Sequence, residues 1–88
     1  MPEISRFYGI VIRMYAEAGA VHHRAHLHAY YGEHEAVYLL NGQRLGGGLP
    51  GSRHRLVLAW MEIHREELLR NWHRLQRGEP PEPIDPLR

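Results

Sequence analysis

The chain has 88 residues, enough for one domain with a single modest hydrophobic core. Its basic residues are 11 arginines against 10 acidic residues, and the net charge of +1 gives no strong electrostatic footprint for nucleic acid. The chain has no cysteine, which excludes disulfides and thiolate metal sites, and no stretch reaches the roughly 18 apolar residues of a membrane span. Met1 is followed by Pro2 and Glu3 rather than by a basic and then apolar leader, so we expect a soluble cytoplasmic protein.

Alternating patterns near the start of the chain predict two strands. Residues 7–15, FYGIVIRMY, are rich in β-branched and aromatic side chains and predict one strand. Residues 26–31, HLHAYY, predict a second strand after an intervening loop. Successive side chains of a strand point to opposite faces, so one face of the second strand carries three rings. These rings are His26, His28 and Tyr30.

Two further strands are predicted before the middle of the chain. Residues 34–40 predict a third strand and residues 43–46 a short fourth one. Between them, Asn41 and Gly42 predict a type I′ hairpin turn, because both central residues of that turn need a positive φ. The glycine-rich run GGGLPG then predicts a flexible link.

The second half of the chain predicts one long helix, with Ser52 as its N-cap and Gly78 as its stop. About 25 helical residues span about 37 Å, whereas six-residue strands span only about 20 Å. The distal part of the helix is therefore expected to overhang the sheet and to need another surface: the tail, a second copy or a partner protein. The helical period predicts an apolar stripe of Val57, Trp60, Met61, His64, Leu68, Trp72 and Leu75, widened by Leu56 and Ile63.

These elements predict an α+β fold, a small antiparallel sheet of three to four strands followed by one long C-terminal helix. We expect a single domain over residues 1–78 and an extended, proline-rich tail over residues 79–88. The pattern does not indicate which face of the sheet the helix covers. His64 lies in the apolar stripe, where it is either a hydrogen-bonded core histidine or a residue that approaches the strand histidines.

Histidines are concentrated in the segment HHRAHLH, residues 22–28. The H-x-H spacing places His26 and His28 on one strand face, about 7 Å apart along the strand. His22, in the preceding loop, supplies a third imidazole, and three protein ligands plus water are typical of catalytic zinc. Glu33 and Glu35 are candidate carboxylate ligands. The pattern therefore suggests a zinc-type site of His22, His26 and His28.

The same segment also suits catalysis without a metal. In small ribonucleases, one histidine can act as general base, another as general acid, and an arginine can hold the phosphate. His26 and His28 are the candidates for the acid–base roles, and Arg24 is the candidate for the phosphate. Arg6 and Arg13 are alternatives to Arg24.

Almost the whole chain resembles the bacterial family known as domain of unknown function 4160. The opening ISRFYGIVIRMY and the segment AVHHRAHLHAYYGEHEAVY resemble that family's start and its hallmark, H-x-P-P-H-F-H followed by a Tyr-Gly-Glu turn. In this chain Arg24 and Ala25 replace the two prolines and Leu27 replaces the phenylalanine. The hallmark histidines fall on His22, His26 and His28. The family's helix motif falls on Trp60, His64, Glu67, Leu68, Asn71 and Trp72.

The resemblance implies a partner protein, because members of this family are often encoded beside a second small family, domain of unknown function 2442. That pairing resembles a toxin–antitoxin operon. We therefore expect one component of a toxin–antitoxin-like pair, and a ribonuclease-type toxin rather than an antitoxin, which would usually show a DNA-binding module and a disordered arm. The alternatives are a zinc-type metal-binding protein and a non-catalytic module that forms a homodimer.

Overall fold

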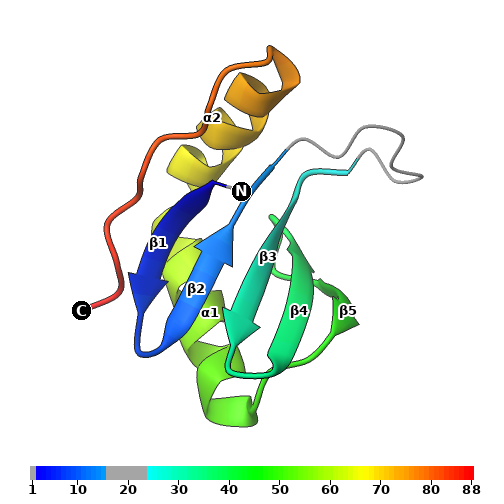
Figure 1. Cartoon of the computed structure of the whole chain (residues 1–88), viewed down its shortest axis with the longest axis vertical. Helices are drawn as coiled ribbons and strands as arrows, with labels where there is room; N and C mark the ends of the chain where they lie inside the picture. The colour runs from blue at the N-terminus through cyan, green and yellow to red at the C-terminus, as the bar shows by residue number, and fades with distance from the viewer. Residues whose placement is uncertain (1, 16–23) are drawn as a thin grey trace.

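The computed structural model describes residues 2–15 and 24–88 of the chain. Within these ranges, an antiparallel sheet is followed by two consecutive helices (Figure 1). The sheet order follows the chain order, β1-β2-β3-β4-β5. The α+β class is confirmed, whereas the expected three to four strands and single helix are corrected to five strands and two helices. The elements are β1 Glu3–Phe7, β2 Ile10–Arg13, β3 His26–Tyr31, β4 His34–Leu39, β5 Arg44–Gly47, α1 Gly51–Ile63 and α2 Arg65–Gln76.

The single strand expected over residues 7–15 is wrong, because a tight turn at Tyr8 and Gly9 separates Phe7, the last residue of β1, from β2. Tyr8 has a φ of 50° and Gly9 a φ of 78°, which is the pair of positive angles that a type I′ turn requires. Phe7 and Ile10 pair directly across this turn. Phe7 and Ile10 both face the core, whereas residues three apart on one continuous strand would point to opposite faces.

The turn between β4 and β5 differs from the expected type I′ turn. Of its residues, Gly42 has a positive φ of 96°, whereas Asn41 does not. The Gly42 N–H donates to the Leu39 carbonyl at 2.8 Å, and the Leu39 N–H donates to the Gln43 carbonyl at 2.9 Å. These bonds define a three-residue loop in which glycine supplies the left-handed position. The extra loop residue moves β5 one position along the chain from the expected 43–46.

A glycine in β5 allows the sheet edge to form. Gly47 has a φ of 67°, and a Cβ at this position would collide with the backbone carbonyl oxygen of Glu35. We expect Gly47→Ala to lower the free energy of unfolding by about 1–3 kcal/mol from backbone strain alone. Gly46→Ala is the matched control, because a Cβ there meets no atom within 4 Å. Denaturant unfolding of both variants tests this, and equal stabilities would contradict it.

The predicted long helix bends at His64, which has a φ of −110° and a ψ of 26°. The hydrogen-bond pattern nevertheless continues across the bend. The His64 N–H donates to the Trp60 carbonyl, and the Leu68 N–H donates to the His64 carbonyl, both at 3.0 Å. No proline or glycine marks this position, so the residue pattern alone cannot locate the bend.

The helical segment also begins earlier than predicted. The N-cap is Pro50 rather than Ser52, and no side chain caps the first turn. The Arg53 and His54 N–H groups both donate to the Pro50 carbonyl at 2.9 Å. Ser52 therefore lies inside the first turn, where it cannot act as the cap. None of the helices within the described residues is long and apolar enough to cross a membrane.

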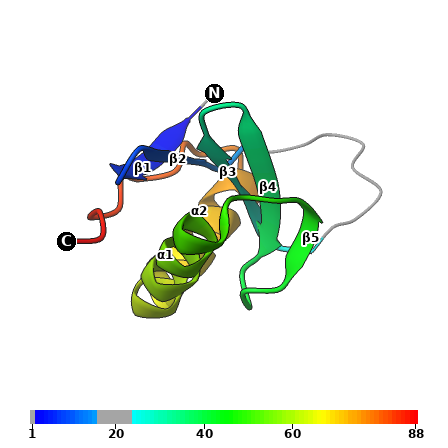
Figure 2. The same ribbon diagram turned by 90° about the horizontal axis from the view of Figure 1, so that it is seen from below.

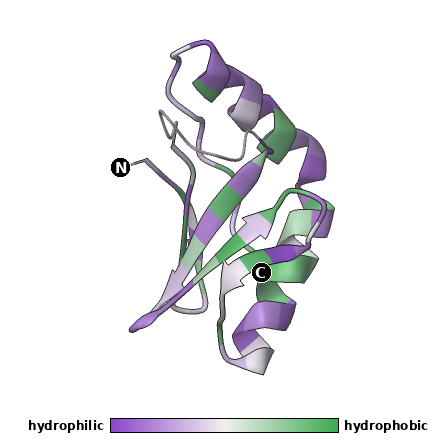
Figure 3. Ribbon diagram, turned by 90° about the vertical axis from the view of Figure 1, so that its right-hand side faces the viewer, coloured by the Kyte–Doolittle hydropathy of each residue, from purple (hydrophilic) through white to green (hydrophobic). Residues whose placement is uncertain are grey.

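Both helices lie on the same side of the sheet, and the hydrophobic core lies between the two layers (Figure 2). The strand register places Ile12, Ala29 and Ala36 side by side on this face, and all three are fully buried. From α1, Trp60 is also fully buried, with its ring centroid 5.3 Å from that of Phe7. The helices show alternating hydrophobic and hydrophilic bands, as expected for helices with one buried face (Figure 3).

Most of the predicted apolar stripe is buried, but its margins differ from the prediction. Ile63, the last residue of α1, is 64 % exposed, because the chain changes direction at the next residue. Asn71, which the stripe omitted, is buried. The stripe residues that the structure buries are Val57, Trp60, Met61, Leu68 and Leu75.

The proline-rich tail folds back along β1 instead of leaving α2 uncovered (Figure 1). Ile84 is buried in the core, and its N–H donates to the Ile4 carbonyl at 2.7 Å. The indole N–H of Trp60 donates to the Asp85 carbonyl at 2.8 Å. Of the three covers expected for the distal helix, the tail is the one that the structure shows, and Leu68 and Leu75 are buried within the chain itself.

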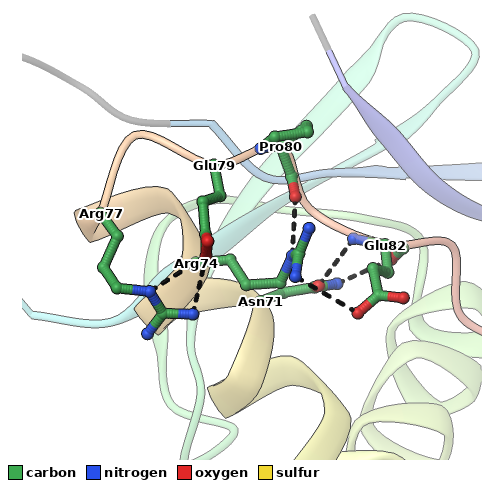
Figure 4. Close-up of polar contacts among 6 residues, drawn as sticks. All are labelled: Asn71, Arg74, Arg77, Glu79, Pro80 and Glu82. Carbon is green, nitrogen blue, oxygen red and sulfur yellow. Dashed lines mark hydrogen bonds and ion pairs between the residues drawn. The ribbon is translucent and has the colours of Figure 1, made fainter.

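A polar clamp on α2 holds this tail (Figure 4). The buried Asn71 side chain donates to the Glu82 carbonyl and accepts from the Glu82 N–H, both at 2.8 Å. The Arg74 Nε donates to the Pro80 carbonyl at 2.8 Å, and Arg77 pairs with Glu79. Asn71 therefore satisfies the backbone polar groups of a segment whose prolines cannot donate.

Candidate functional site

One sheet face gathers the histidines of β3 with residues of β2 and β4. The register pairs Arg13 with His28, and pairs Tyr30 with Glu35. His26 and His28 lie on the opposite side of β3 from the fully buried Leu27 and Ala29, which face the core. The open question of sheet faces is thus resolved, because the core face and the histidine face are different. We call this second surface the polar sheet face, made of Arg13, Tyr15, His26, His28, Tyr30 and Glu35.

His26 lies at the start of β3 in a nearly closed environment, with 7 % of its surface exposed. Its Nδ1 lies 2.8 Å from the backbone carbonyl of Arg24. In the neutral ring, Nδ1–H then donates to this carbonyl, and Nε2 is the acceptor nitrogen. The His26 ring lies 5.3 Å from the Trp72 ring and 5.4 Å from the His28 ring.

His28 lies in the middle of the polar sheet face between two tyrosines. Its ring stacks on Tyr15 at 4.9 Å and is nearly parallel to Tyr30 at 6.4 Å. The side chain is only 12 % exposed, and its Nδ1 lies 3.6 Å from a carboxylate oxygen of Glu35. This is ion-pair distance when the imidazole is protonated. Arg13 lies over the Tyr30 ring, with its Cζ 5.9 Å from the ring centre.

The other candidate residues fall in different places. His22 lies outside the described residues. Arg24 is exposed two residues before β3, and Glu33 is exposed in the turn after that strand. Arg6 binds Glu3 on β1 at 2.7 Å. Over residues 2–15 and 24–88, no group of three or more His, Asp or Glu side chains is arranged to hold a metal ion.

His64 does not contact the strand histidines. Its Nδ1 lies 2.6 Å from a carboxylate oxygen of Glu67, one turn further along, and its ring packs 5.6 Å from Trp60. The side chain is 13 % exposed. Of the two alternatives for His64, the structure supports the hydrogen-bonded core histidine.

Sequence reasoning missed two aromatic neighbours of the histidines, Tyr15 and Trp72. Residues two apart on a strand share a face, so Arg13 and Tyr15 lie on one side, but the sequence does not show that this side meets His28. The antiparallel register supplies this pairing. Trp72 meets His26 only because α2 follows the bend at His64.

A second polar contact joins the sheet to α1. The buried Tyr38 hydroxyl lies 2.7 Å from Nδ1 of His54, and the two rings stack at 5.6 Å. Burial raises the pKa of Tyr38 above its ordinary value, and the positive charge of Arg44 partly opposes this rise. The phenol therefore stays protonated, and its hydrogen bond with His54 stabilises the fold rather than supplying a base.

The raised pKa of Tyr38 predicts a loss of stability in alkali. Below the ordinary pKa of about 10, the phenol is neutral in both the folded and the unfolded chain. As pH rises through that value, the unfolded chain releases its proton more readily, so the free energy of unfolding falls. Tyr38→Phe should remove this contribution in denaturant titrations between about pH 9 and about pH 11. If the free energy of unfolding of the variant falls equally steeply with pH, ionisation of Tyr38 is not the cause of the loss of stability.

Comparison with known proteins gives one match. The model of a family described as a domain of unknown function, DUF4160, matches residues 9–73. No curated protein and no solved structure matches the chain. The matched range includes the polar sheet face and ends within α2, before the tail.

Proposed function

The chain belongs to the DUF4160 family, and from that premise we propose that it is the toxin-like member of a toxin–antitoxin-like pair and cleaves RNA without a metal. The observation that carries this proposal is the pair of imidazoles on the polar sheet face, with ring centres 5.4 Å apart. Two such rings at one site suit the acid and the base of a phosphodiester cleavage.

The proposed reaction assigns a separate role to each histidine. His26 acts as the base through Nε2, because its Nδ1 is engaged by the Arg24 carbonyl. It removes the proton from a ribose 2′-hydroxyl, whose oxygen forms a bond to phosphorus. The bond from phosphorus to the 5′-oxygen breaks, and protonated His28, beside Glu35, gives its proton to that oxygen. The products are a 2′,3′-cyclic phosphate and a free 5′-hydroxyl.

Arginines beside the histidines supply the positive charge that the phosphate needs. Arg24 is exposed two residues before β3, and Arg13 lies over Tyr30 on the polar sheet face. A guanidinium binds phosphate through two parallel hydrogen bonds and stabilises charge that develops on its oxygens. Arg6 is the weaker candidate, because its side chain is bound to Glu3.

The test is an RNA-cleavage assay with untagged protein in the presence of a chelator. We expect cleavage of single-stranded RNA with a 2′,3′-cyclic phosphate end, and no cleavage where the attacking 2′-hydroxyl is replaced by hydrogen. Cleavage that needs an added metal, or a product with a free 3′-hydroxyl and a 5′-phosphate, would contradict the proposed chemistry. No cleavage of any RNA in the absence of the partner protein would contradict the toxin assignment.

A zinc-type site is the second candidate, and the bond from His26 Nδ1 to a backbone carbonyl favours it. Metal-bound histidines usually donate their other ring N–H to such a group. The proposed ligands are His26 and His28 with His22. Metal analysis of untagged protein, purified without nickel resin, tests this candidate. Stoichiometric zinc that is lost in a His26→Ala, His28→Ala protein would support it over metal-free cleavage.

The partner in this proposal is a small antitoxin-like protein. Ile63 and Leu69 are the large hydrophobic side chains that α1 and α2 leave exposed, at 64 % and 45 %. Sedimentation of the protein alone and with the neighbouring gene product separates this proposal from its alternative, a homodimer without catalytic activity. A stable homodimer that does not bind the neighbouring gene product would contradict the proposed toxin–antitoxin-like pair.

A further inference from the structure

Tyr30 is a large aromatic side chain on the surface of the sheet rather than in the core. It lies on β3, the middle strand of the sheet order. The register pairs it with Val11 of β2 and with Glu35 of β4, and pairs Val11 in turn with Arg6 of β1. Tyr30 and Val11 are half-buried, whereas Arg6 and Glu35 are exposed. Both helices lie on the other side of the sheet (Figure 2), so Tyr30 stands on the polar sheet face.

The Tyr30 ring belongs to a row of three nearly parallel rings on this face. His28 is the middle member, and its plane makes an angle of 18° with the Tyr15 ring and of 12° with the Tyr30 ring. The ring centres lie 4.9 Å apart in the first pair and 6.4 Å apart in the second. Parallel aromatic rings on a sheet surface are a common platform for the bases of a single-stranded nucleic acid, because every base can stack on them.

Positive charge lies beside this row of rings. The Arg13 Cζ lies 5.9 Å from the centre of the Tyr30 ring, and Arg24 is exposed two residues before β3. These two guanidiniums complement the phosphates of a nucleic acid, while the flat ring of Tyr30 complements a base. Of the two register partners of Tyr30, only Val11 is apolar. The face therefore suits a nucleic acid better than an apolar protein segment.

We propose that Tyr30 is the base-stacking residue of the polar sheet face and that it restricts the substrate to single-stranded RNA. The base of a nucleotide next to the scissile phosphate stacks on Tyr30, while the phosphate lies at His28. The two ring centres are 6.4 Å apart, about the length of one extended nucleotide. In a duplex the bases are paired and stacked on one another, so they cannot reach this ring. The inference rests on the proposed RNA cleavage and adds the form of the substrate and the residue that recognises it.

The test measures binding separately from cleavage. The probe is a short, fluorescently labelled single-stranded RNA in which every 2′-hydroxyl is methylated, so that the proposed attack on phosphorus cannot occur. Its anisotropy is followed at constant ionic strength. Tyr30→Ala should weaken binding about 5- to 150-fold, the loss expected for one base-stacking contact. Tyr30→Phe, which retains the ring, should bind like the original chain.

Tyr8→Ala is the matched control for Tyr30→Ala. It removes the same ring from the turn between β1 and β2, where Tyr8 is 55 % exposed, and should leave binding unchanged. Tyr30 belongs neither to the hydrophobic core cluster nor to the side chains packed against it, so Tyr30→Ala should still fold. Denaturant unfolding of the two variants checks this.

The outcomes separate this inference from the proposed reaction. Binding that depends on Tyr30, without cleavage of the unmodified RNA, would support the stacking role and contradict the reaction. Cleavage by a Tyr30→Ala protein that binds the probe like the original chain would leave the reaction standing and overturn the stacking role. Equal binding of the probe and of its duplex would also overturn it. So would a lack of RNA binding together with a neighbouring gene product that covers Tyr30, because the face would then be a protein interface.

Discussion

Replacing His28 with alanine should lower the rate of RNA cleavage by about 10²–10⁴-fold, the range expected when a general acid is removed. His28 is the natural residue to test, because it lies at the centre of the polar sheet face, between Tyr15 and Tyr30 and beside Glu35. Its side chain is 12 % exposed and contributes no atom to the hydrophobic core cluster, so the variant should still fold. The measurement is the single-turnover rate with chelated protein.

His34→Ala is the matched control for this variant. His34 lies on β4 in the same sheet, but it is exposed and stacks on Tyr31 rather than on the polar sheet face. We expect its cleavage rate to match that of the original chain. Glu35→Gln should give a smaller loss than His28→Ala, because the carboxylate acts only through the imidazole. An unchanged rate in folded His28→Ala protein would remove His28 from the reaction.

Trp60→Ala should destabilise the protein by about 3–5 kcal/mol, the usual range for removing a large aromatic side chain from a core. The Trp60 side chain is fully buried, packs on Phe7 and holds the tail through its bond to the Asp85 carbonyl. Domains of this size have about 5–15 kcal/mol in total, so a large part of the protein should unfold at moderate temperature. Thermal and denaturant unfolding measure this effect.

Trp60→Phe separates the two contributions of this residue. Phenylalanine retains much of the apolar contact with Phe7 but cannot donate to Asp85. Losing that bond leaves a carbonyl without its donor, which should cost about 1–3 kcal/mol. Leu69→Ala, on the exposed side of α2, should change stability by less than about 0.5 kcal/mol. A Trp60→Ala protein as stable as Leu69→Ala would contradict the assignment of Trp60 to the core.

The side-chain periodicity of the sequence predicts most of this fold. Alternation in HLHAYY correctly puts Leu27 and Ala29 on one face of β3 and the histidines on the other, although it did not indicate which of the two faces is the core face. The helical period correctly identifies Trp60 and Leu68 as core residues. Both predictions succeed because burial of one face dictates the pattern along a strand or a helix.

Features that do not depend on burial were not predictable in this way. The turn at Tyr8 and Gly9 lies within a run of aromatic and β-branched residues, and Tyr8 is a rare residue at a positive φ. The bend at His64 keeps its backbone hydrogen bonds and lacks the usual marker residues. The position of the tail depends on hydrogen bonds from Asn71. This residue is polar, so the spacing of apolar side chains does not identify it as buried.

The candidate site was predictable in part. The H-x-H spacing was sufficient to bring two imidazoles together. Tyr15, Trp72 and Glu35 surround them through strand register and helix direction, which one sequence does not encode locally.

The bond between Ile84 and Ile4 joins two residues that lie near opposite ends of the chain. Such a contact can form only after nearly all residues have been synthesised, so the core around Trp60 is completed late. Contacts of large sequence separation also slow folding, and we expect a slow final phase in which the tail docks. A chain that ends where the family match ends, at residue 73, would lack this phase together with the Trp60 and Asn71 bonds to the tail.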